Sequence, residues 1–259
     1  MSEEQLFEKA QKYFFKIRLA GKNIEIECTS GRGFAACRNY LADFDVPDFT
    51  VKASRSRMLE EYTAFHGNSR CEELLDGKEE IGAMESSVIC QEIAARMLDY
   101  NTLLMHGAVV AKDNKAYMFT APSGVGKTTR ASLWLKEYPD SIVVNGDKPF
   151  IMITDENVLA CGTPWCGKEG WNTNTIVPLH AIFFLERAVE SEDNLVKEIS
   201  FCEALPMLLQ QAYYPVGLNS VQRIIKLIER LKENVKFYRF RSTPTEDSIR
   251  LAYETACLR

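Results

Sequence analysis

A glycine-rich turn that carries a lysine and two threonines is the part of this sequence best suited to chemistry. It reads APSGVGKTT from Ala121 to Thr129 and follows an apolar segment. A turn between a strand and a helix presents backbone N–H groups and the positive end of the helix dipole to an anion. The spacing therefore predicts a phosphate-binding loop, in which Lys127 contacts the β- and γ-phosphates and Thr128 a magnesium ion.

The loop departs from the usual phosphate-binding pattern at its first position, where Ala121 stands in place of glycine. This residue closes the turn and does not touch the ligand, so alanine is tolerated there if its φ angle is negative. Arg130, two residues beyond Thr128, is a candidate to assist phosphate binding, although an arginine on the helix surface explains it more simply. The residues predicted to bind the nucleotide are Ser123, Gly124, Val125, Gly126, Lys127, Thr128 and Thr129.

Two carboxylates are candidates for the second half of such a site. Asp147 ends the apolar segment SIVVNGD, which follows the helix predicted after the loop. In a parallel sheet the carboxyl end of that strand opens toward the loop, where Asp147 can hold magnesium or orient an acceptor hydroxyl. Glu186, at the end of AIFFLE, has the form of an ATPase carboxylate, although a core strand that ends in an acidic residue explains it more simply.

The segments that must position these groups alternate between strand-like and helix-like patterns after residue 102. Two apolar strands joined by a polar turn at Asp113-Asn114 lead into the loop, and three short apolar runs of buried-strand type follow its helix. Helices are predicted near 202–213 and 220–233, and a strand at VKFYRFR. A last helix is predicted with Thr243 as its N-cap and Pro244 at its first position.

The first hundred residues have a mixed pattern. The predicted elements are a hairpin turning at 21–23, a helix at 34–44, a strand at 49–53, and helices at 57–65 and 87–100. No linker rich in proline, glycine or serine separates the two halves. The sequence thus predicts an α/β protein, in which residues 1–100 form an N-terminal α+β elaboration that could recognise an acceptor and residues 101–259 form the nucleotide-binding core.

Three segments together resemble the C-terminal domain of HPr kinase/phosphorylase and its kinase-like relatives: MHGAVVAKDNKAYMFTAPSGVGKTT, VVNGDKPFI and CGTPWCGKE. The resemblance spans residues 102–190, and the N-terminal hundred residues do not share it. It implies a P-loop fold like that of ATP-dependent phosphoenolpyruvate carboxykinase. It also implies transfer of the γ-phosphoryl group of ATP, with Mg2+, to a hydroxyl group of a protein, a peptide or a small molecule.

Matched position by position, Ser123 to Thr128 correspond to the nucleotide loop of that family, His106 to the histidine before it, and Asp147 to the second residue of an acidic pair. Gly146 replaces the first acidic residue, which in the family is usually given the general-base role. Phosphoryl transfer depends mainly on positioning and charge neutralisation, so a kinase with Asp147, Lys127 and His106 as catalytic residues is the main hypothesis. The alternatives are a nucleotide-binding sensor or pseudokinase, and an ATPase that uses Glu186.

The segment CGTPWCGKEGWNTNT, residues 161–175, has no helical or alternating period. A loop of this length is typical of a lid or a binding loop, and the competing interpretation is a surface loop pinned by its own aromatic residues. The family resemblance extends into GTPW. Trp165 and Lys168 are therefore predicted to contact substrate, the tryptophan beside an adenine or an acceptor and the lysine beside a phosphate.

Composition narrows the class of function. The net charge of −5, from 31 basic and 36 acidic side chains, argues against a nucleic-acid scaffold. No run of 18 apolar residues occurs, so no membrane span is expected. The N-terminal segment lacks an apolar signal core, which favours a cytoplasmic protein whose eight cysteines are reduced and mostly buried. The acceptor and the oligomeric state, monomer or homo-oligomer, are left open.

Overall fold

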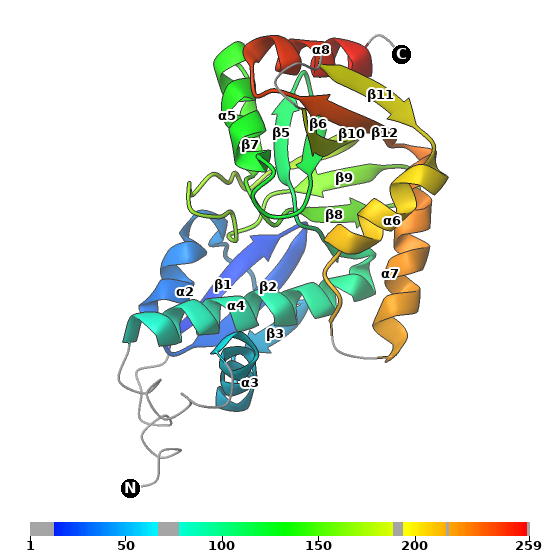
Figure 1. Ribbon diagram of the computed structural model, residues 1–259. Helices are drawn as coiled ribbons and strands as arrows, with labels where there is room; N and C mark the ends of the chain where they lie inside the picture. Colours follow the sequence, from blue (N-terminus) through cyan, green and yellow to red (C-terminus); the bar gives the residue numbers. More distant parts are fainter. Residues whose placement is uncertain (1–12, 67–77, 189–193, 216–217, 258–259) are drawn as a thin grey trace, which may run out of the picture. The chain divides into compact units, whose positions relative to one another are not determined.

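The computed structural model describes residues 13–66, 78–188, 194–215 and 218–257. The chain divides into two compact units, Met1–Arg96 and Met97–Arg259 (Figure 1). The boundary lies close to residue 100, where the sequence pattern changes. Within the described ranges, no helix is long and apolar enough to cross a bilayer.

The first unit is built on a three-stranded sheet in the order β1-β2-β3. β1 (Tyr13–Leu19) and β2 (Lys22–Cys28) form an antiparallel hairpin, and β3 (Phe49–Lys52) pairs parallel with β2. Alternate residues of β2 are buried, which is the period of a strand with one covered face. The helices of this unit are α2 (Gly31–Ala36), η1 (Arg38–Tyr40), α3 (Arg55–His66) and α4 (Lys78–Met97).

These elements differ from the predicted ones mainly in where they begin and end. The hairpin turns at Ala20 and Gly21, which both have positive φ angles, slightly earlier than predicted. The single helix predicted at 34–44 is wrong, because the short helices α2 and η1 occupy residues 31–40 instead. The helix predicted at 87–100 begins at Lys78 and continues after Met97 as η4 (Leu98–Tyr100).

A buried carboxylate joins α4 to the segment before α2. Glu85 is fully buried and accepts hydrogen bonds from the backbone N–H groups of Thr29 and Ser30 at 2.6 and 2.7 Å. The hydroxyl of Thr29 donates a third hydrogen bond to it at 2.8 Å. Because these bonds satisfy both oxygens, Glu85 has a structural role.

The second unit contains a nine-stranded sheet in which the longest strand, β10 (Ile176–Arg187), joins two parts. The strands lie in the order β4-β8-β9-β10-β6-β5-β7, and β12 and β11 extend the sheet from β10. β10 pairs antiparallel with β9 through its first residues and parallel with β6 and β12 through the rest. The other strands are β4 (Thr102–Leu104), β5 (Ala108–Lys112), β6 (Lys115–Thr120), β7 (Ile142–Asn145), β8 (Phe150–Ile153), β9 (Val158–Cys161), β11 (Leu195–Ile199) and β12 (Lys236–Ser242).

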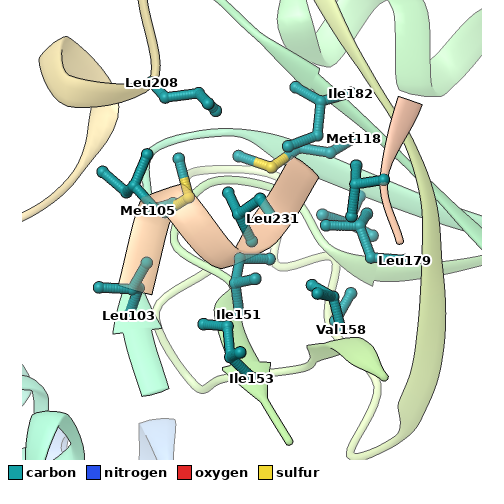
Figure 2. Close-up of a cluster of buried hydrophobic side chains, with 14 of the residues drawn as sticks. Leu103, Met105, Met118, Ile151, Ile153, Val158, Leu179, Ile182, Leu208 and Leu231 are labelled. Atoms are coloured by element: carbon teal, nitrogen blue, oxygen red, sulfur yellow. The ribbon is translucent and has the colours of Figure 1, made fainter. Parts of the chain in front are cut away.

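Helices cover both faces of this sheet, so the second unit is an α/β structure. Met118 and Ile182 belong to an apolar cluster (Figure 2) that packs against α6 (Phe201–Gln211) and α7 (Leu218–Arg230). Phe119 and Phe183, the next residues of the same strands, belong to a second cluster, which packs against α5 (Lys127–Glu137) and α8 (Glu246–Cys257). The fully buried Trp134 lies 5.0 Å from the Tyr117 ring and anchors α5 on the sheet.

The strands predicted in this unit are confirmed, except that the first predicted segment is divided into β4 and β5 and that β9 and β11 are additions. Asp113 and Asn114, both with positive φ angles, form the turn between β5 and β6, and the three apolar runs after α5 form β7, β8 and β10. The short β9 and the largely exposed β11 give no comparable apolar signal. The prediction of Thr243 as the last N-cap is wrong: α8 begins at Glu246, and the Thr245 hydroxyl accepts a hydrogen bond from the Ser248 N–H at 3.3 Å.

Candidate functional site

The segment predicted to bind phosphate connects β6 to α5, so it lies between a buried strand and the start of a helix. Gly124 and Gly126 have φ angles of 79° and 109°, a region that residues with side chains rarely adopt. Ala121 is not among the residues with positive φ, so the first position of the motif accommodates alanine without strain. The two glycines are therefore required by the backbone of the turn.

Lys127 is the first residue of α5, and its side chain folds back over the loop. Only 8% of the residue is exposed, and Nζ donates to the carbonyl oxygens of Ala121 and Pro122 at 2.9 and 3.4 Å. Burial lowers the pKa of Lys127, and the negative charge of Asp147 opposes this effect. The ammonium group is thus held within the turn and within electrostatic reach of a carboxylate.

The remaining loop residues offer hydroxyl groups and one apolar anchor. Ser123 and Thr129 are exposed, and Thr128 is half-buried. The Thr128 side chain has no hydrogen-bond partner in the part of the chain that the structure describes, which leaves its oxygen available to a ligand. Val125 packs against the apolar cluster under α5, so only its backbone N–H is free to serve binding.

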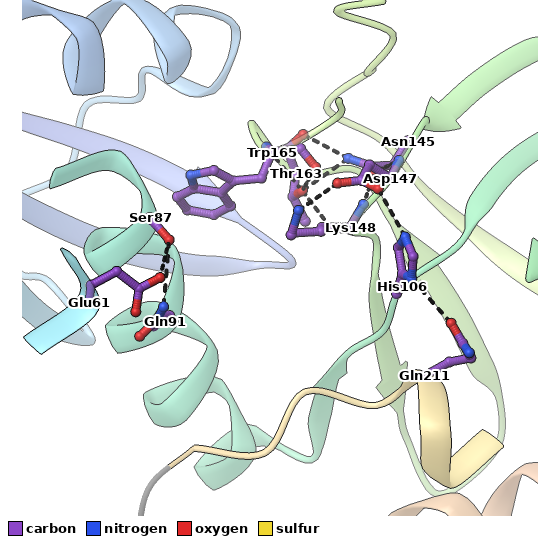
Figure 3. A network of polar contacts seen from close by, with 10 residues as sticks. All are labelled: Glu61, Ser87, Gln91, His106, Asn145, Asp147, Lys148, Thr163, Trp165 and Gln211. Carbon is purple, nitrogen blue, oxygen red and sulfur yellow. Dashed lines mark hydrogen bonds and ion pairs between the residues drawn. The ribbon is translucent and has the colours of Figure 1, made fainter. Parts of the chain in front are cut away.

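His106 and Asp147 form a pair in the polar network of Figure 3. Nε2 of His106 lies 3.3 Å from Oδ1 of Asp147, and Nδ1 of the same ring lies 3.1 Å from Oε1 of Gln211. Nζ of Lys148 lies 2.5 Å from the other carboxylate oxygen, Oδ2. The hydrogen bond from His106 and the charge of Lys148 hold the pKa of Asp147 well below its usual range, although burial opposes them. Asp147 is therefore ionised at neutral pH.

The topology of the sheet explains why these residues meet. β5 runs antiparallel to both β6 and β7, so the start of β5 and the ends of β6 and β7 lie at one edge. The Gly107 N–H donates to the carbonyl oxygen of Asp147 at 2.9 Å, and the Thr120 hydroxyl donates to that of His106 at 2.8 Å. The structure thus brings His106, Asp147 and the end of the loop strand to the same edge.

Polar residues that the sequence did not single out support this pair. Oδ1 of the fully buried Asn145 accepts hydrogen bonds from the N–H groups of Asp147 and Lys148 at 2.8 and 2.6 Å. Its Nδ2 donates to the carbonyl oxygen of Thr163 at 2.9 Å. The sequence could have indicated a role for Asn145, because this polar residue ends an apolar run two positions before Asp147. Gln211 is 105 residues from the histidine that it contacts, so no local pattern indicates it.

Gly146 is enclosed by the loop of residues 161–175. Its N–H donates to the carbonyl oxygen of Trp171 at 2.9 Å, and the Thr173 N–H donates to that of Val144 at 3.1 Å. A Cβ atom at position 146 would lie 2.7 Å from the carbonyl oxygen of Cys166, which is too close for any side chain without a shift of the loop. In this chain, packing requires glycine at the position where the resembling family has a carboxylate.

The same loop holds the two residues predicted to contact substrate. Lys168 is exposed and Trp165 is half-buried. Gly167 lies against Asp147, since a Cβ atom on this glycine would lie 3.4 Å from the Asp147 Cβ. Lys168 therefore follows a residue that borders the candidate site. The ring of Trp165 points away from Asp147 in Figure 3, so the structure does not bring it to the carboxylate.

Two arginines approach the glycine-rich loop of residues 121–129. Arg130 is 3% exposed, and its Nη2 donates to the carbonyl and hydroxyl oxygens of Ser242 at 2.8 and 2.9 Å. The prediction of a helix-surface arginine is wrong, because this side of α5 packs against the end of β12. Arg187, which the sequence did not single out, donates from Nη2 to the carbonyl oxygen of Gly124. The parallel pairing of β10 with β6 brings the end of β10 to the loop.

Glu186 lies near the end of β10 and pairs with a neighbouring strand. Its Oε1 lies 3.1 Å from Nη1 of Arg239 on β12, and both side chains are more than a third exposed. Alternation along β10 places Glu186 on the face of Ile182 and Phe184, opposite the face that α5 covers. This ion pair favours the simpler interpretation, a buried strand that ends in an acidic residue.

The oxygen donors at the loop fit a magnesium ion that is held largely by a nucleotide. Mg2+ in such sites takes one or two protein oxygens and completes its shell with phosphate oxygens and water. The carboxylate of Asp147 and the hydroxyl of Thr128 are donors of this kind. Across the ranges that the structure describes, no group of three or more His, Cys, Asp or Glu residues is arranged to hold a metal, so a cage made of protein ligands is not found there.

Comparison with known proteins gives little beyond the fold. No known family profile matches the chain, and no curated protein matches its sequence. Among solved structures, the HPr(Ser) kinase/phosphatase from Coxiella burnetii matches with a TM-score of 0.34 and 12% identity, over 59% of this chain and 87% of the other. This is a distant likeness of fold, and it carries no inference about activity, ligand or acceptor.

Proposed function

We propose that this protein is a kinase that uses ATP and Mg2+ to phosphorylate a hydroxyl group of a protein, a peptide or a small molecule. The observation that carries the proposal is the turn between β6 and α5. Its glycines have positive φ angles, and the Lys127 ammonium is folded into it. Such a turn directs backbone N–H groups, a helix dipole and a cation at one point, which suits the phosphates of a nucleotide.

The proposed roles follow from the position of each side chain. The loop N–H groups from Ser123 to Thr129 and the Lys127 ammonium hold the phosphates. Thr128 and Asp147 supply oxygens for the metal, which when bound neutralises charge on the transferred phosphoryl group. His106 or Asp147 orients the acceptor hydroxyl. Nε2 of His106 and Oδ1 of Asp147 lie 3.3 Å apart, and His106 is hydrogen-bonded to the end of β6, the strand that leads into the loop.

One carboxylate is sufficient for phosphoryl transfer at a reduced rate. Phosphoryl transfer has a loose transition state, so correct placement and charge neutralisation provide most of the acceleration. General-base assistance contributes typically ~10²–10⁴-fold. We therefore expect slow transfer that depends on Asp147.

A nucleotide-binding sensor without transfer is the second candidate. The close approach of the Cys166 carbonyl to Gly146 favours it, because that approach excludes a second carboxylate on this strand. In the proposed kinase, Lys168 contacts a phosphate and Trp165 lies beside an adenine or an acceptor. The sensor requires no contact to an acceptor.

Incubation with Mg2+ and ATP labelled at the γ-phosphate separates these functions. The candidate acceptors are serine peptides and polyols, and mass spectrometry of the products shows where the phosphate goes. A phosphorylated acceptor supports the kinase, free phosphate without an acceptor supports an ATPase, and binding without turnover supports the sensor. Lys127→Ala should abolish nucleotide binding. The matched control is Lys136→Ala on the same helix, where the exposed lysine pairs with Glu246 of α8.

A further inference from the structure

Arg130 is a buried cation one helical turn after the first residue of α5. It is 3% exposed, and its guanidinium lies 5.8 Å from the centre of the Phe240 ring. Its two hydrogen bonds go to the carbonyl and hydroxyl oxygens of Ser242. Both acceptors are neutral groups.

The charge of Arg130 has no anionic partner within the described residues. Burial lowers the pKa of the guanidinium, and no carboxylate contributes to the shift. Arginine stays protonated in proteins at neutral pH even so. A buried charge without an opposite charge is costly, and a protein usually keeps one only where another requirement demands it.

The Nη1 side of this guanidinium lies against the loop. Nε is buried and has no hydrogen-bond partner in the described part of the chain. Nη1 would lie 3.1 Å from a Cβ atom at Gly126, the residue at which the loop enters α5. The cation is therefore close behind the N–H groups that the helix presents at its N-terminus.

We propose that Arg130 is a buried electrostatic residue for the phosphate groups of a nucleoside di- or triphosphate bound at this loop. The inference rests on the proposed function, because it takes the loop as the phosphate site. The phosphates supply the negative charge that the protein does not place beside Arg130. The arginine acts from behind the loop, while Lys127 contacts the phosphates directly.

This arrangement has a thermodynamic consequence that a purely structural arginine would not have. In the nucleotide-free protein the unpaired charge costs stability, and in the complex the same charge stabilises the bound phosphates. Replacing Arg130 by an apolar side chain of similar length removes this cost but also removes the two hydrogen bonds to Ser242, so the nucleotide-free Tm should change little. The same replacement should weaken nucleotide binding. Stability and affinity should therefore respond differently to the substitution.

The test compares Arg130→Met with the wild type and with Lys136→Met, which removes an exposed charge from the same helix. Calorimetric titration with Mg2+ and ATP gives Kd, and a thermal melt without nucleotide gives Tm. We expect Arg130→Met to raise Kd at least tenfold with little change in Tm. We expect Lys136→Met to change Kd less than twofold. Arg130→Lys, which keeps the charge, should recover most of the lost affinity.

The outcomes distinguish this inference from the function on which it rests. If the wild type binds no nucleotide, both are overturned. If the wild type binds but Arg130→Met binds equally well, only the role of Arg130 is overturned. A parallel loss of Tm and affinity in Arg130→Met, or its failure to fold, also overturns the role of Arg130, because the arginine then holds the fold. A Kd for Arg130→Lys as weak as that for Arg130→Met would count against the role of charge.

Discussion

Substitution of Gly146 tests whether this position is a lost carboxylate or a packing requirement. In Gly146→Ala the new Cβ atom would lie 2.7 Å from the Cys166 carbonyl oxygen and 3.4 Å from that of Trp171. Atoms in ordinary contact are about 3.5 Å apart or more, so the loop backbone must move back by several tenths of an ångström. That movement strains the hydrogen bond from Gly146 N–H to Trp171, which is 2.9 Å long.

The expected cost follows from comparable overpacking in other proteins. Forcing an extra methyl group into a well-packed site costs typically about 1–3 kcal/mol. For a domain of this size each kcal/mol lowers Tm by about 2–4 °C, so Gly146→Ala should melt roughly 2–12 °C below the wild type. Gly146→Asp adds a carboxylate beside two carbonyl oxygens and should cost at least as much. The aspartate variant is therefore expected to lose stability without gaining phosphoryl transfer.

The assay is a thermal melt followed by tryptophan fluorescence, since Trp165 and Trp171 lie in the loop that must move. Gly31→Ala is the matched control, because its Cβ would meet its nearest neighbour, the Tyr13 hydroxyl, at an ordinary 3.7 Å. The control should melt with the wild type. A Gly146→Ala variant as stable as the wild type would refute the packing argument. So would a Gly146→Asp variant that transfers phosphate faster at unchanged Tm.

Three further outcomes are expected. Folding lowers the pKa of Asp147, so the ionised carboxylate stabilises the folded state. This stabilisation of the fold is complete above the ordinary pKa of an aspartate, about 3.9, and is lost as the pH falls through the lower pKa of the folded protein. Asp147→Asn should therefore cost about 1–3 kcal/mol at pH 7 in denaturant melts, with a smaller difference from the wild type at pH 3. Native alkylation read by peptide mass spectrometry should label Cys202 and Cys257 before any of the five buried cysteines among the described residues; rapid labelling of Cys161, whose pKa burial raises to about 12, would contradict the packing around it. Glu186→Gln should leave ATP turnover unchanged and alter stability by no more than ~1 kcal/mol, whereas a large loss of turnover would favour the ATPase.

The sequence predicted most of the strands in the second unit because their apolar runs are short, continuous and bounded by turn residues. The turn at Asp113-Asn114 and the glycine loop depend only on local backbone preferences, and local patterns report these well. Asp147 could be chosen because it ends such a run. The sequence therefore indicates Asp147, but it gives less indication of the side chains that orient this carboxylate.

Contacts between distant segments account for what could not be predicted. Arg130 looked like a surface residue because its partner, Ser242, is 112 residues away. The hydrogen bonds that hold His106 between Gln211 and Asp147 likewise join three separate segments. The ends of the helices were the hardest elements to predict. The early part of α4, for example, is held by a contact between Glu85 and the backbone before α2, which is 55 residues away in the sequence.

The glycines around the site meet two different physical requirements that look alike in the sequence. Gly124 has open space around its Cβ position and is needed only for its φ angle of 79°. Gly162 and Gly146 are needed for space, since a Cβ at Gly162 would lie 1.8 Å from the Thr173 carbonyl oxygen. The first requirement shapes the glycine-rich loop between β6 and α5, and the second allows the loop of residues 161–175 to lie close to β7. Asp147 borders this second loop, because a Cβ atom at Gly167 would lie 3.4 Å from the Asp147 Cβ, so the packing of the loop helps to fix the position of the carboxylate.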